Sequence, residues 1–101
     1  MKIEEIKEKV RRGEYYISFT HTEKLRRRRI SAGQIEQAIS RGEIIEDYSY
    51  DVRGASCLIL GFTAKGEPLH IVCGKAEEEI IIITAYEPSL SKWEEDLRTR
   101  R

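Results

Sequence analysis

The chain of 101 residues has a mass of 11.8 kDa, which is the size of one small domain (1–101). Charged residues make up 36% of it, and 18 basic residues balance 18 acidic ones, so the net charge is zero. This balance argues against a protein that coats nucleic acid non-specifically, but it leaves room for a local basic site. No apolar run approaches the ~18 residues that a membrane span needs.

The compartment can be inferred from the N-terminus and the cysteines. The opening residues are too acidic for a signal peptide, and two cysteines are too few for a disulfide scaffold. We therefore expect a cytoplasmic protein with free thiols. Charge is uneven along the chain: residues 1–42 carry 11 basic and 6 acidic residues, whereas residues 43–97 carry 4 basic and 12 acidic ones. Residues 1–42 therefore favour a polyanionic partner, and residues 43–97 favour a basic partner.

The first part of the chain shows helix and strand patterns in alternation. Apolar residues at helical spacing predict an amphipathic helix over residues 2–12. Residues 15–20 are aromatic and β-branched, which predicts a short strand. A basic helix follows, which Thr22 can cap, and Ser31 with Gln34 forms the capping box of a further helix.

The second part of the chain changes to the pattern of strands. The four predicted strands span residues 43–50, 56–63, 68–74 and 80–86. Short connections favour an antiparallel meander, and helices must cover at least one of its faces. Ser91 with Glu94 forms a second capping box, which predicts a C-terminal helix. The sequence thus predicts an α+β fold: a four- to five-stranded, mainly antiparallel sheet packed with two to three N-terminal helices and a C-terminal helix.

The turn between the two middle strands decides where the cysteines point. A two-residue turn at Lys65-Gly66 places Cys57 and Cys73 on opposite faces, where they cannot bridge. A three-residue turn places them directly opposite each other. We expect the first arrangement, and in both cases buried free thiols that act as small apolar groups.

Four consecutive arginines, Arg26–Arg29, form the first candidate site. We expect residues 24–29 to be helical and at least two of the four to be exposed, because four guanidiniums cannot all be paired inside. Guanidinium groups match phosphate oxygens in bidentate fashion, so Arg26, Arg28 and Arg29 are candidate RNA-binding residues. The alternative is a solvated helix whose arginines pair with nearby glutamates.

Three residues are candidates for proton transfer. His21 stands at the predicted strand-to-helix junction, His70 lies within a strand, and Tyr86 ends the last strand, where side chains emerge into clefts. Each also has a structural interpretation: a backbone-bonded histidine, a core histidine and an edge aromatic. The cysteines and histidines lack the close paired spacing of a zinc site, and there is no Gly-rich phosphate loop. We therefore expect no metal and no cofactor.

The chain also carries a set of short motifs. They are Phe19-Thr20-His21 before an arginine-rich helix, Leu58-Ile59-Leu60-Gly61, Gly66-x-Pro68-Leu69-His70-Ile71-Val72, Ile83-Thr84-Ala85-Tyr86-Glu87-Pro88, and then Trp93 and Arg98. Together they resemble the domain of unknown function 4258 family over residues 17–101. This resemblance implies a small α+β domain related to the RelE-like ribonuclease toxins. Members are often encoded beside a small zinc-finger protein that resembles an antitoxin.

The resemblance marks His21, His70, Tyr86 and an arginine of the run as site residues. From it we expect an endoribonuclease (mRNA interferase-like) toxin of a toxin–antitoxin pair. Because the sequence has no carboxylate or histidine cluster able to hold a metal, we expect such an enzyme to cleave RNA without metal. The alternative is a non-catalytic module that binds RNA or a protein. An enzyme needs these residues to converge in a cleft beside the arginines, whereas buried and separate histidines favour the binding module.

Overall fold

The computed structural model describes the backbone of residues 1–101 and all side chains except those of residues 19 and 20. Its helices are α1 (Ile3–Arg11), α2 (Phe19–Arg27) and α3 (Ala32–Ser40). Its strands are β1 (Tyr15–Ile17), β2 (Glu43–Tyr48), β3 (Ser56–Phe62), β4 (Pro68–Ala76) and β5 (Glu79–Tyr86). The predicted α+β class and the order of these eight elements are confirmed. No helix of the described chain is long and apolar enough to cross a membrane.

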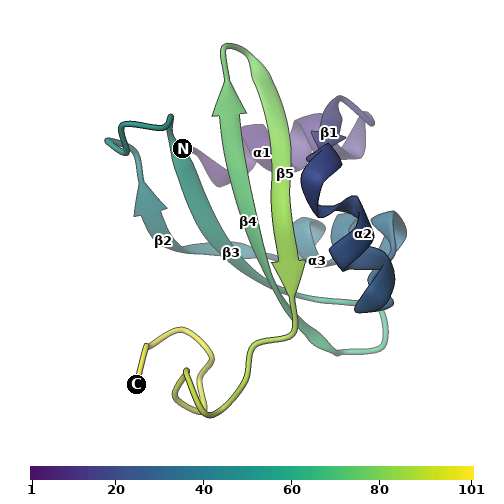
Figure 1. The fold of residues 1–101 in the computed structure, drawn as a ribbon, viewed down its shortest axis with the longest axis vertical. Coiled ribbons are helices and arrows are strands. Elements are labelled where there is room, and N and C mark those ends of the chain that lie inside the picture. Colours follow the sequence, from purple (N-terminus) through teal and green to yellow (C-terminus); the bar gives the residue numbers. More distant parts are fainter.

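The strands form one five-stranded sheet in the order β1-β5-β4-β3-β2 (Figure 1). Strands β2 to β5 are the predicted antiparallel meander, and β1 pairs in parallel with β5. Because β3, β4 and β5 are internal strands, their sequences are apolar on both faces. Helices α1 and α3 cover one face of the sheet, and α2 lies beside β5 (Figure 1).

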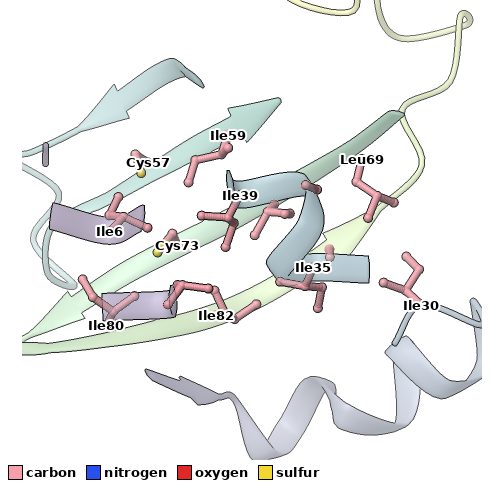
Figure 2. Close-up of a cluster of buried hydrophobic side chains, with 14 of the residues drawn as sticks. Ile6, Ile30, Ile35, Ile39, Cys57, Ile59, Leu69, Cys73, Ile80 and Ile82 are labelled. Carbon is pink, nitrogen blue, oxygen red and sulfur yellow. The ribbon is translucent and has the colours of Figure 1, made fainter. Parts of the chain in front are cut away.

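The hydrophobic core lies between these helices and the inner face of the sheet (Figure 2). Alternate residues of the internal strands point into it, as the period of two requires. The helices contribute fully buried isoleucines, among them Ile6, Ile35 and Ile39. The outer face of the sheet is also partly buried, because Leu58 and Leu60 on β3 are buried outside that core cluster.

The β3–β4 hairpin contains a three-residue turn, so the expected two-residue turn is wrong. Thr63 N–H donates to the Glu67 carbonyl at 2.9 Å, and Gly66 takes a φ of 81°. A left-handed glycine at this position is the usual solution for three-residue hairpin loops. The register therefore places Cys57 directly opposite Cys73, and both are free thiols that point into the core (Figure 2).

Helix α2 starts earlier and ends earlier than the sequence suggests. The strand expected over residues 15–20 ends at Ile17, and α2 begins at Phe19. Thr22 does not cap it, because its hydroxyl donates to the Ser18 carbonyl at 3.2 Å from within the first turns. The end of β1 remains tied to the sheet, since Ser18 N–H donates to the Ile82 carbonyl. Strand β1 lies at the edge of the sheet with β5 as its neighbour, and helical hydrogen bonding takes over directly after it.

The expected C-terminal helix is wrong. Residues 87–101, which we call the C-terminal segment, form turns and a small irregular hairpin. Asp96 accepts the N–H groups of Arg98 and Thr99, which bends the chain, and Leu97 takes a φ of 60°. A two-turn helix is marginal by itself, so tertiary contacts of the segment with the sheet outweigh the Ser91 capping signal.

Helix α3 packs unusually close to β3 because Gly61 has no side chain. A Cβ atom added at Gly61 would lie 1.9 Å from the Ala38 carbonyl oxygen. Gly42, directly after α3, is similarly confined, since its Cβ would lie 2.7 Å from the Ile59 side chain and 3.2 Å from the Leu60 carbonyl oxygen, both on β3. The two glycines therefore set the distance between the helix layer and the sheet.

We expect the Gly61→Ala variant to lose about 3 kcal/mol of the free energy of unfolding, because the added methyl group must displace the backbone of α3. The control is Gly33→Ala on the exposed side of α3, where the nearest atom would be 3.8 Å away. That change should instead add about 0.5–1 kcal/mol, since alanine is the better helix former. Urea denaturation of both variants measures the difference, and equal effects would contradict the close approach.

Candidate functional site

A cleft opens where the end of α2, the end of β5 and the C-terminal segment meet. It consists of two cavities of about 440 and 340 Å³, which share the side chains of Arg28, Tyr86 and Glu87. We call it the basic cleft. Its lining residues are Arg28, Ile30, Tyr86, Glu87, Ser89, Lys92, Trp93 and Arg100. Three of the eight are cationic, and one is a carboxylate.

His70 lies behind Tyr86 and is fully buried on the outer face of the sheet. It is the direct register partner of Tyr86 on β5 and of Leu60 on β3. Its Nε2 atom lies 2.7 Å from the Leu97 carbonyl oxygen, and its Nδ1 atom lies 3.4 Å from the Tyr86 hydroxyl. The Trp93 ring packs edge-on against the imidazole, with ring centroids 4.4 Å apart.

These contacts define the protonation state of His70. A carbonyl oxygen only accepts, so Nε2 carries the proton and donates it to Leu97. Burial lowers the pKa of His70, an effect that the bond to the Leu97 carbonyl partly offsets, so the ring is neutral at neutral pH. Neutral Nδ1 is then an acceptor, and the Tyr86 hydroxyl donates to it. Burial raises the pKa of Tyr86, which keeps its phenol protonated.

The C-terminal segment is attached to the outer face by ion pairs with β2. The Arg100 guanidinium donates to both Glu46 carboxylate oxygens, at 2.8 and 2.9 Å, and lies 4.6 Å from the Trp93 ring centroid. Arg98 pairs with Glu43. The hydrogen bonds from Arg100 hold the pKa of the Glu46 carboxyl below its ordinary value, and Arg100 lines the cleft with its charge already balanced.

Arg28 is the arginine of the run that the structure places in the basic cleft. Its Nη1 atom donates to the Ala85 carbonyl at 2.8 Å and to the Thr84 hydroxyl at 3.2 Å. These bonds join the end of α2 to the end of β5 and fix the guanidinium beside Tyr86. Both described bonds use one nitrogen, so the rest of the guanidinium can serve a ligand.

The other arginines of the run lie outside the basic cleft, and all four are exposed, which confirms the expectation of at least two. Arg26 and Arg27 lie 3.8 and 3.9 Å from the Glu23 carboxylate, which matches the alternative of a solvated, paired helix surface. Arg29 lies beyond the helix, so the expectation of a helix through residue 29 is wrong.

The end of α2 has the hydrogen bonds of a Schellman motif. Ile30 N–H donates to the Leu25 carbonyl and Arg29 N–H donates to the Arg26 carbonyl, both at 3.0 Å. Arg29 occupies the left-handed position of this motif with a φ of 58°. Glycine is preferred there because any Cβ atom is strained, so arginine at this position is not explained by the stability of the helix end.

His21 lies in the first turn of α2 and not at a junction. Its side chain is half-buried, and its Nδ1 atom is buried without a described hydrogen-bond partner. None of its described contacts reaches His70, Tyr86 or Arg28. The structure thus brings Tyr86, His70 and Arg28 together, and places His21, Arg26 and Arg29 elsewhere.

The sequence did not single out Lys92 and Arg100 as site residues, and it assigned no role to Glu87. The sequence shows Glu87 as the carboxylate beside the end of the last strand, without giving it a role. Lys92 and Arg100 reach the cleft because the C-terminal segment is irregular and folds back. A helix over those residues, as the capping signal predicts, would have placed them differently.

The domain of unknown function (DUF4258) family model matches residues 21–87, which is most of the chain, and the protein belongs to this family. The match starts at His21 and ends at Glu87, so it contains every site residue predicted from the sequence. It leaves out Trp93 and all other residues of the C-terminal segment after Glu87. No curated protein and no solved structure matches the chain.

The buried His70 predicts a pH-dependent stability. Its pKa is lowered on folding from the ordinary value of 6.5, so the unfolded chain binds a proton first on acidification. The free energy of unfolding contributed by His70 is therefore complete above pH 6.5 and falls as the pH drops below it. The carboxyls that face it, such as Glu46, titrate at lower pH because their pKa is lowered.

We expect the His70→Gln variant to lose this pH dependence. Between about pH 7.5 and pH 5.5 its free energy of unfolding should fall less than that of the wild type, as measured by urea denaturation at several pH values. An unchanged slope in His70→Gln would contradict the buried neutral imidazole.

The left-handed Arg29 gives a second prediction. Arg29→Gly should raise the free energy of unfolding by about 0.5–1 kcal/mol, because it removes a strained Cβ atom from the end of α2. Arg27→Gly, two residues earlier and still helical, makes the same chemical change and should lower it by a similar amount. Thermal or urea denaturation checks both, and effects of the same sign would contradict the assigned helix end.

Proposed function

We propose that this protein binds single-stranded RNA in the basic cleft and cleaves it without metal, as an mRNA interferase-like toxin of a toxin–antitoxin pair. The observation that carries the proposal is the hydrogen bond between Tyr86 and His70 at a cleft lined by Arg28, Lys92 and Arg100. Among the described residues, no group of three or more His, Cys, Asp or Glu is placed to hold a metal. The toxin assignment rests on the resemblance of the family to RelE-like ribonuclease toxins.

Phosphate binding is assigned to Arg28 and Lys92. Arg28 is already oriented by two hydrogen bonds to β5, so little side-chain freedom is lost when it binds a phosphate. Lys92 adds a second positive charge to the lining of the cleft. A guanidinium beside the scissile phosphate also stabilises the negative charge of the phosphorane transition state.

Proton transfer is assigned to Tyr86. Its phenol stays protonated at neutral pH because its pKa is raised, and it borders both cavities. It can therefore supply a proton to the 5′-oxygen that leaves when the 2′-oxygen attacks the phosphate. His70 is fully buried and engaged on both ring nitrogens, so it acts as a positioning residue that holds the phenol.

A second candidate is an RNA-binding module that does not cut. The burial of His70 and its separation from His21 favour it, because neither imidazole reaches the cleft. The same arginine and lysine would then hold phosphates without chemistry. The two candidates differ in one measurable property, which is cleavage.

We expect purified protein to cut single-stranded RNA in the presence of a chelator and to leave 2′,3′-cyclic phosphate ends. Tyr86→Phe should lower the cleavage rate about a hundredfold or more, because the proton donor is lost. Arg28→Ala should weaken RNA binding and reduce the slope of its salt dependence by about 0.7, the value for one phosphate contact on a single strand.

Arg27→Ala is the matched control, since it removes the same charge from the same helix outside the cleft. It should leave cleavage and the salt slope nearly unchanged. Binding that depends on Arg28 without any cleavage would identify the non-catalytic module. If the protein neither binds nor cuts RNA, the basic cleft has no role in RNA recognition and both candidates are wrong.

A further inference from the structure

We propose that Glu87 is the general base that takes the 2′-hydroxyl proton, which deepens the proposed function and rests on it. Metal-free cleavage of RNA needs one group to accept that proton and another to protonate the leaving 5′-oxygen. Tyr86 is protonated and supplies the second group, so the first remains to be found. The candidate must be a basic atom that borders the same phosphate position.

The position of Glu87 meets this condition. It lines both cavities of the basic cleft, together with Arg28 and Tyr86. These three residues therefore lie where the two cavities meet. A strand of RNA that places one nucleotide in each cavity puts the phosphate between them beside the Arg28 guanidinium, with the carboxylate and the phenol at the same place.

The second observation is that Glu87 is available. None of the side chains that the structure describes forms a hydrogen bond or an ion pair with its carboxylate. The nearby carboxylates of Glu43 and Glu46 differ, because arginines of the C-terminal segment engage them. An unpaired carboxylate repels phosphate, so its presence in a phosphate-binding cleft serves binding poorly and serves proton transfer well.

The cleavage step moves one proton at each side of the phosphate. The Tyr86 hydroxyl first turns its proton from His70 Nδ1 toward the 5′-oxygen. The 2′-oxygen then forms a bond to phosphorus while its proton moves to the Glu87 carboxylate, and the bond from phosphorus to the 5′-oxygen breaks as Tyr86 gives that oxygen its proton. The products are a 2′,3′-cyclic phosphate and a 5′-hydroxyl. Exchange with water then returns Glu87 to the carboxylate and Tyr86 to the phenol.

The test separates binding from cleavage in the Glu87→Gln variant. We expect its single-turnover cleavage rate to fall about a hundredfold, because the amide cannot accept the proton. Its affinity for a non-cleavable RNA that carries 2′-O-methyl groups should be unchanged or higher, since a negative charge is removed from the cleft. Glu95→Gln, an exposed carboxylate outside the cleft, is the matched control and should leave both quantities unchanged.

Each other outcome overturns the assignment in a distinct way. If Glu87→Gln cuts RNA at or above the wild-type rate, the carboxylate only repels phosphate and Glu87 is not the base, while the proposed function stands. If the variant loses affinity together with cleavage, its role is in building the cleft. If the wild-type protein does not cut RNA, the proposed function fails first and the assignment of Glu87 fails with it.

Discussion

The hydrogen bond from the buried His70 ring to the Leu97 carbonyl is the interaction on which the site depends. It satisfies a polar group that would otherwise be buried without a partner, and it fixes the only tautomer in which Nδ1 can accept from Tyr86. It also attaches the C-terminal segment to the sheet, and that segment supplies Lys92, Trp93 and Arg100 to the cleft. One buried imidazole thus connects the sheet, the tyrosine and the wall of the cleft.

The sequence leaves two roles open for His70, one in proton transfer and one as a core residue. In this arrangement the two roles fall on different residues. A group that touches substrate must be accessible, and His70 is not, because Trp93 and Leu97 cover it. Tyr86, in contrast, is only half-buried and lines the cleft, and burial raises the pKa of its phenol, which stays protonated. In the function that we propose, chemistry at the cleft is assigned to Tyr86 and Glu87, and His70 holds the phenol in position.

The deviations from the sequence-based expectations have physical causes at particular residues. Ser91 and Glu94 match a capping box, but the helix does not form. Asp96 accepts the Arg98 N–H group, which turns the chain, and the Leu97 carbonyl accepts a hydrogen bond from His70. Gly66 permits a left-handed turn of three residues, which places Cys57 opposite Cys73. A sequence pattern reports only on local structure. Contacts between distant segments decided the conformation of the C-terminal segment, and the φ angle of Gly66 decided the length of the turn.

The sequence by itself determined the α+β class, the order of the three helices and five strands, and the candidacy of Tyr86 and of an arginine in the run. It could do so because hydrophobic period, turn residues and the Ser31–Gln34 capping box act over a few neighbouring residues. Only the tertiary structure decided that Arg28 is the arginine in the cleft, that His21 lies apart from His70, and that Glu87 lies beside Tyr86 without a partner among the described side chains. These facts depend on how α2, β5 and the C-terminal segment meet in space, which no local spacing encodes.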